Sequence, residues 1–171
     1  MATDCDDAGA LAVLHVLADN GECEILATVS SSLNPTGCAA ISAINNYYQR
    51  PDLPIGTVKG QGVNEKSRFT DRLATDFPHR FRDGGQPPDA LDIYREILEE
   101  QPDQSVTVVT VGYLTNLRNL MLFPAVNVRA SGADLIRAKV RKWVCMGAIS
   151  SAIPQEAVNR RGVLAAAEHG W

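Results

Sequence analysis

Apolar positions along the chain switch between helical and strand-like spacing, and this pattern predicts the order of the elements. Between residues 8 and 18 leucines and alanines recur at helical spacing, and Asn20-Gly21 supplies a left-handed stop, so this segment is predicted to be a helix. A short buried strand is predicted next over residues 24–30, with its apolar run at residues 25–29. Asn34-Pro35 then breaks the chain before the next helix.

The same rhythm continues to residue 146. It predicts strands over residues 54–58, 106–111 and 142–146, and helices over residues 36–48, 88–100 and 115–122. Residues 59–86 lack a clear period, which favours a long loop with one helical turn near residues 72–77. The β-branched run at 106–111 is suited to a central parallel strand.

Alternating strands and helices are typical of the α/β class, with a parallel, Rossmann-like sheet covered by helices on both faces. The predicted sheet is incomplete, because no strand precedes the first helix. Ligands in this class bind at the carboxyl ends of the strands. The loops after Ser30, Val111 and Met146 and the start of the first helix are therefore the places where a site is expected.

Composition narrows the classes of function and partner. The formal net charge of -4 in 171 residues argues against a nucleic-acid-binding protein, so a nucleic-acid-like ligand should be small. No apolar run is long enough to cross a bilayer, and Met1 is followed by acidic residues, which predicts a soluble, cytoplasmic protein without a membrane partner. The four cysteines lack zinc-type spacing and are predicted to be reduced and mostly buried.

The acidic run before the first helix is the strongest chemical signal in the chain. Asp4, Asp6 and Asp7 place three carboxylates within four residues at a helix N-terminus. One interpretation is an N-cap with first-turn acids, which the helix dipole stabilises. The other is a site for a hard divalent cation, because carboxylates this close repel one another unless a cation lies between them.

Residues 1–11 resemble the second part of the nucleoside hydrolase signature, in which an Asp-x-Asp pair is followed by a turn, an Asp-Asp-Ala and a helix. Asp6-Asp7-Ala8 stands where that Asp-Asp-Ala is expected. Further stretches are similar to the same family in the same order. They are Leu33-Asn34-Pro35, residues 48–56, the Gly-x-Leu-Thr-Asn segment within residues 109–117, and the strand with its Met-Gly turn at residues 142–147.

The resemblance covers roughly residues 1–148 and implies the inosine- and uridine-preferring type, acting in purine and pyrimidine salvage. The implied reaction is hydrolysis of the N-glycosidic bond of ribonucleosides to ribose and free base. The implied roles are Asp7 and the main-chain carbonyl of Val111 as Ca²⁺ ligands, Asp6 as a partner of a ribose hydroxyl, and Asn34 as a contact of ribose or its bound water. A calcium ion there would fix the attacking water and lower its pKa.

Departures from the family pattern are equally informative. The Asp-x-Asp that supplies the general base would lie upstream of Met1, so no catalytic residue is assigned in this numbering. Residues 149–171 match nothing in the family and are interpreted as a divergent tail after a partial domain over residues 1–148. We therefore expect weak or absent calcium binding, and turnover near background.

Two alternatives to a hydrolase remain. One is a non-catalytic ribose- or sugar-binding domain of the same fold. The other is a magnesium-dependent phosphate-handling enzyme, although the chain lacks a glycine loop with a lysine that could cradle phosphate. An incomplete sheet also favours association into a homo-oligomer, because it leaves an edge and a face exposed.

Three other side chains carry weaker predictions. His15 lies among apolar neighbours on the first helix and is predicted to be a core or boundary residue. His79, in the long loop, is predicted to be solvated. Trp143 is predicted to pack against the sheet.

Overall fold

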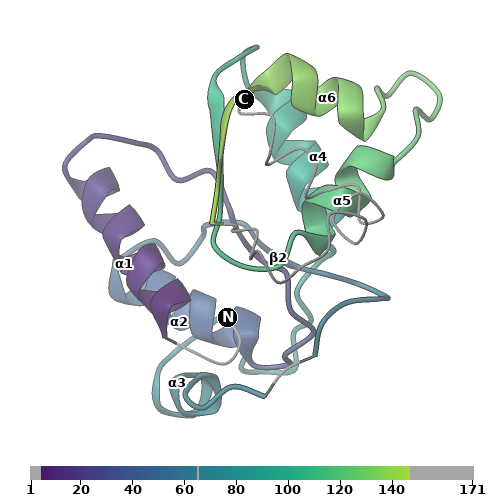
Figure 1. Ribbon diagram of the computed structural model, residues 1–171. Coiled ribbons are helices and arrows are strands. Elements are labelled where there is room, and N and C mark those ends of the chain that lie inside the picture. The colour runs from purple at the N-terminus through teal and green to yellow at the C-terminus, as the bar shows by residue number, and fades with distance from the viewer. Residues whose placement is uncertain (1–4, 65, 147–171) are drawn as a thin grey trace, which may run out of the picture. The chain divides into compact units, whose positions relative to one another are not determined.

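The computed structural model describes residues 5–64 and 66–146. The chain divides into two compact units, Met1–Ile97 and Leu98–Trp171, and each is described by itself. Figure 1 shows the elements. In chain order they are α1 (Asp6–Asp19), β1 (Thr28–Ser30), α2 (Gly37–Tyr47), β2 (Ile55–Thr57), α3 (Thr70–Asp76), α4 (Ala90–Glu100), β3 (Val106–Thr110), α5 (Thr115–Leu122), α6 (Gly132–Lys139) and β4 (Val140–Cys145).

Helix α1 forms as its sequence predicts, although it begins at Asp6 rather than at residue 8. Leu11 and His15, one turn apart, are the residues that it buries. The helix ends where Gly21 adopts a φ of +76°, a conformation that glycine reaches without steric cost. The predicted left-handed stop at Asn20-Gly21 is confirmed.

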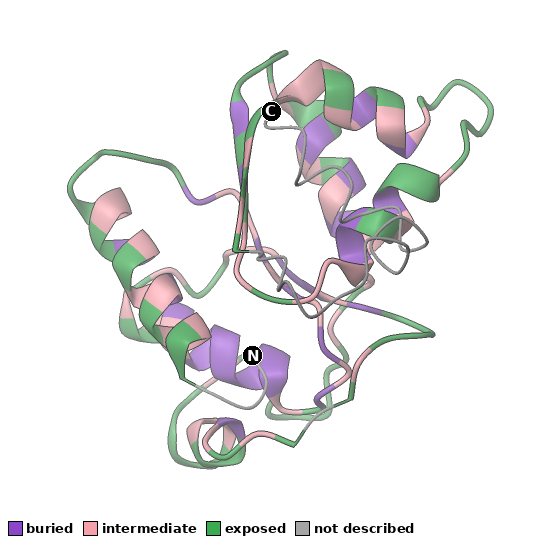
Figure 2. Cartoon of the chain, viewed as in Figure 1, coloured by how far each residue is buried: buried purple, intermediate pink, exposed green. Residues whose placement is uncertain are grey.

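Helix α2 lies at the centre of the first unit and is buried over most of its length (Figure 2). Its alanines and Gly37 carry little side chain, so neighbouring elements approach its backbone closely. The core cluster of this unit consists of Leu11, Cys38, Ala40, Ile41 and Ile55. This cluster joins α1, α2 and β2, and the burial of its apolar surface is the main source of stability in the unit.

Helices α1 and α2 lie side by side, inclined to each other, and both run in the same general direction (Figure 1). His15 bonds to Asn45, which is 30 residues further along the chain, and Asp19 bonds to Arg50, which is 31 residues further. Arg50 lies just beyond the end of α2, so these bonds bring the C-terminal ends of the two helices together, while Leu11 packs with Cys38 and Ile41 nearer their N-termini. Their N-termini therefore lie at the same end of the pair.

The strands of the first unit are short. β1 pairs in parallel with β2, in the register Thr28↔Ile55 to Ser30↔Thr57. The strand predicted over residues 24–30 is thus present but shorter, since only Thr28–Ser30 pair with β2. The helical turn predicted near residues 72–77 is confirmed as α3.

The second unit contains a parallel pair, β3 and β4, with an irregularity between Val106 and Thr107. Helix α5 matches its predicted bounds. Helix α6 was not predicted, although its start carries a local signal. The Ser131 hydroxyl accepts a hydrogen bond from the Asp134 amide at 3.1 Å, as in a capping box. Hydrogen bonds from Ser131 and Arg137 hold the pKa of Asp134 below its usual value.

The described strands form two separate two-stranded parallel sheets, whereas the sequence predicts one sheet. The fold is therefore mixed α/β, with six helices among the described residues. The strand predicted at residues 106–111 forms as β3, but it is not central, because β4 is its one partner among the described strands. The Val109 side chain is 56% exposed. One face of β3 is buried, with Val106 and Val108, while Thr107 and Val109 on the other face are exposed.

The cysteines are free thiols, but the prediction that most are buried is wrong. Cys5 and Cys23 are exposed because they flank helix α1 in irregular backbone. Within the described part of the chain, no helix has the length and apolarity that a membrane span requires. The predicted tail, residues 149–171, lies outside the described residues.

The close approach of α4 to β2 predicts opposite effects for one substitution at two glycines. A Cβ added at Gly56 would lie 2.8 Å from the Ala90 Cα, a backbone atom that cannot yield easily. Gly56→Ala should therefore lower the free energy of unfolding by about 1–3 kcal/mol. Gly9 in α1 has no such neighbour within 4 Å, so Gly9→Ala should raise it by about 0.5–1 kcal/mol. Urea unfolding measures both, and equal effects of the two substitutions would contradict this packing.

Candidate functional site

Polar side chains gather where β1 ends and helix α2 begins. Asn34 follows β1 and is 7% exposed. Its Nδ2 donates to Thr70 Oγ1 at 3.0 Å, and its Oδ1 accepts from the Thr36 amide at 3.2 Å. The loop after β1 is thereby tied to the first residue of α3. This is the kind of strand end at which the α/β class places its ligands.

Hydroxyl groups extend these bonds into a directed chain. Thr36 Oγ1 lies 2.8 Å from Thr70 Oγ1 and 2.7 Å from Asp71 Oδ1. The Asp71 carboxylate can only accept, so the Thr36 hydroxyl proton is assigned to it as the strongest acceptor within reach. The Thr70 hydroxyl, which accepts from Asn34, then donates to Thr36. This series of hydrogen bonds runs from the buried Asn34 amide to the exposed Asp71 carboxylate.

Asp6 and Asp7 open helix α1, and the Asp7 amide donates to Asp6 Oδ1 at 2.9 Å. No side chain caps this helix at Cys5, so the first-turn carboxylates face the positive end of the helix dipole. Because α1 and α2 are parallel, this acidic pair lies at the same end of the helix pair as the Asn34 loop. Asp4 lies outside the described residues.

Val111, the fourth residue implicated by sequence, directly follows β3 in the second unit. The turn there is held by the amide of Met146, which donates to the Thr110 carbonyl at 2.8 Å. Trp143 Nε1 donates to Thr110 Oγ1 at 3.0 Å, which adds a side-chain bond between β4 and β3. The joint role of Asp7 and Val111 in one metal site stays a prediction, because they belong to different units.

Cys38 and His79 serve the fold in this unit. Burial raises the pKa of the Cys38 thiol, whose Sγ lies 3.6 Å from the Gly56 carbonyl. A neutral, buried thiol is a poor nucleophile. His79 is half-buried instead of solvated: its Nδ1 accepts from the Phe81 amide, and its Nε2 lies 3.0 Å from the Ala74 carbonyl.

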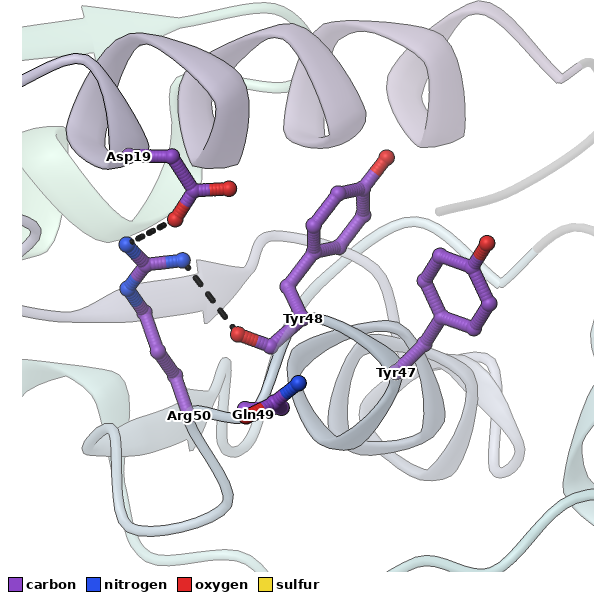
Figure 3. A pocket seen from close by; sticks show the side chains of 5 residues that line it. All are labelled: Asp19, Tyr47, Tyr48, Gln49 and Arg50. Atoms are coloured by element: carbon purple, nitrogen blue, oxygen red, sulfur yellow. Dashed lines mark hydrogen bonds and ion pairs between the residues drawn. The ribbon is translucent and has the colours of Figure 1, made fainter.

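A second feature of the first unit is a shallow hollow of about 380 Å³ at the C-terminal end of α2 (Figure 3). It is lined by Asp19, Tyr47, Tyr48, Gln49 and Arg50. Arg50 and Asp19 are joined across it at 2.6 Å, and Arg50 also donates to the Tyr48 carbonyl. This hollow lies at the other end of the helix pair from the acidic residues.

Sequence reasoning did not identify Thr36, Thr70 and Asp71 as members of the cluster. Threonine and aspartate are favoured at helix N-termini, so Thr70 and Asp71 indicated the start of a helix, but not its partners. Their pairing with residues 34–36 earlier in the chain depends on how α3 packs against α2, which no local pattern records.

Comparisons of the chain with family models, with curated proteins and with solved structures gave no match.

The hydrogen-bond chain predicts a large effect of Thr70→Val. The substitution removes the acceptor of Asn34 Nδ2 at a position that is fully buried, so it should lower the free energy of unfolding by about 1–3 kcal/mol. Thr75→Val removes an exposed hydroxyl from the same helix and should change stability by less than about 0.5 kcal/mol. Chemical denaturation of the two variants measures the difference. Equal losses in the free energy of unfolding would show that the buried hydrogen bonds contribute no more stability than an exposed hydroxyl.

Proposed function

We propose that this chain carries the ribose-binding part of an N-ribosyl hydrolase site, of the kind that splits ribonucleosides into ribose and free base. The observation that carries the proposal is the common location of Asp6, Asp7 and Asn34 at one end of the parallel helices α1 and α2. The residues come from segments 27 or more positions apart in sequence. Their residue types match those that the sequence resemblance implies for ribose and calcium.

The strand pairings support a finer proposal for the fold. In a doubly wound sheet with strand order three, two, one, four, five, six, the second strand pairs with the third and the fourth with the fifth, all in parallel. The parallel pairs β1–β2 and β3–β4 correspond to these two pairings if the first strand of such a sheet precedes α1. We propose that the two pairs belong to one Rossmann-like sheet of this type.

The ribose diol would be held by groups that accept hydrogen bonds. Asp6 and Asp7 carry such acceptors at the start of α1, and Asp71 adds an exposed carboxylate at the start of α3. Asn34 fixes the loop after β1, because its amide is bonded on both sides. In this arrangement Asn34 acts first as a positioning residue for the strand end at which ribose is proposed to bind.

The fit of the chain to a calcium ion is partial. Carboxylates are the ligands that calcium prefers, and Asp6 and Asp7 supply two of them. Among the described residues, however, no group of three histidine, cysteine or acidic side chains is arranged to hold an ion. A bound calcium would orient the attacking water and lower its pKa. With the ligands present, its affinity should be low.

Titration calorimetry tests the ribose site directly. We expect calcium to bind more weakly than about 10⁻⁴ M, because affinity follows the number of charged ligands. Ribose and inosine should bind weakly, and Asp6→Asn and Asp7→Asn should weaken that binding. The matched control is Asp52→Asn, an exposed acid in the loop between α2 and β2, which should leave binding unchanged. Equal binding by all four proteins would refute the site, and submicromolar calcium binding would refute the partial ligand set.

A turnover assay separates hydrolase from binder. No carboxylate in the 171 residues matches the general base of the family, and loss of a general base alone costs about 10² to 10⁴ in rate. The purified 171-residue chain should therefore hydrolyse inosine and uridine at the background rate. Strong turnover that Asp7→Ala abolishes would show that other residues complete the site.

A further inference from the structure

The buried histidine of α1 connects three elements of the first unit. His15 is 0% exposed, and its ring stacks on Tyr48 with centroids 4.6 Å apart. His15 Nε2 lies 2.9 Å from Asn45 Oδ1, and Asn45 Nδ2 donates to Thr28 Oγ1 at 3.2 Å. The imidazole thus links α1 through α2 to strand β1.

The partner of the second ring nitrogen fixes the protonation state. His15 Nδ1 lies 3.3 Å from Arg50 NH1. A guanidinium can only donate, so Nδ1 must present its lone pair and the ring proton must be on Nε2. Nε2 then donates to Asn45 Oδ1. Both contacts are satisfied only by the neutral imidazole.

We propose that His15 is a pH-sensitive latch between the C-terminal halves of α1 and α2, closed when its imidazole is neutral and opened when Nδ1 takes up a proton. The added N–H would point at the Arg50 guanidinium, and two donors of like charge cannot share a 3.3 Å contact. Arg50 must then leave the ring. Its other bonds in this junction, to the Tyr48 carbonyl and to Asp19, are strained or lost with that movement.

The groups around the ring determine the pH at which this occurs. Burial lowers the pKa of His15 most strongly, and the charge of Arg50 lowers it further, whereas the hydrogen bond of Asn45 and the charge of Asp19 raise it. The net direction is below the ordinary value of 6.5. Thr28 and Asn45 are neutral, and the Tyr48 phenol belongs to the stacked ring, so Arg50 and Asp19 are the charges that face this junction (Figure 3).

The sign of the pH dependence follows from linkage. In the unfolded or opened state His15 takes up its proton near pH 6.5, while in the closed state it does so only at lower pH. The latch therefore contributes its full stability above pH 6.5 and loses it as the pH falls from there toward the lowered pKa. One proton allows at most a roughly tenfold increase in opening per pH unit.

Nuclear magnetic resonance of the full chain tests the latch between pH 8 and pH 5. The nitrogen shifts of His15 should show an unprotonated Nδ1 at neutral pH and a titration midpoint below 6.5. Protection of the α1 amides from hydrogen exchange, corrected for the intrinsic rate, should fall by up to about tenfold per pH unit below 6.5.

Three variants distinguish protonation of His15 from nonspecific effects of low pH on the protein. His15→Gln keeps a donor and an acceptor but cannot take up this proton, so the loss of protection in α1 should disappear. Arg50→Gln removes the opposing charge and should raise the titration midpoint of His15, an outcome that can be read even if the first variant folds poorly. His79→Gln, the matched control in the loop after α3, should retain the full pH step. Protonation of His15 at pH 7, or an unchanged step in a folded His15→Gln protein, would overturn the proposal.

Discussion

The parallel pairing of helices α1 and α2 is the constraint on which the rest of the first unit depends. Leu11 from one helix and Cys38 and Ile41 from the other enter a single apolar core with Ile55 of β2. The small residues of α2 allow this approach, because alanine and glycine leave its surface nearly flat. Once the two helices share a direction, their N-terminal ends, and with them Asp6, Asp7 and Asn34, must lie at the same side of the unit.

Buried polar groups fix the register of this pairing. An apolar interface between small side chains tolerates sliding, whereas a buried hydrogen bond does not, because an unsatisfied polar atom in the core costs about 1–3 kcal/mol. His15 with Asn45 sets the register at one end of the helix pair, and Asn34 with Thr70 holds the loop at the other end. The Asn34 bond therefore positions the loop of the candidate ribose site, while the His15 bond holds α1 against α2.

The two-stranded parallel sheets leave strand edges and apolar side chains exposed. Strand β1 has β2 as its only ladder partner among the described strands, and β3 likewise has only β4. Parallel sheets are usually buried on both faces, yet the Val109 and Val144 side chains are 56% and 42% exposed. Exposed strand edges and apolar faces of this kind favour further pairing.

The sequence by itself determined the local elements of this protein, because helical and strand periodicities are properties of neighbouring residues. Helix α5 and the stop at Gly21 were predictable in this way, and α6 carried a capping signal at Ser131 and Asp134 that would have located it. Tertiary structure alone decided which partners those elements found. The bond between Asn34 and Thr70 and the contact between His15 and Arg50 join residues 36 and 35 positions apart, and their formation depends on the packing of α1 and α3 against α2. No local pattern contains that information, since the free energy that selects such pairs comes from burial shared between distant segments.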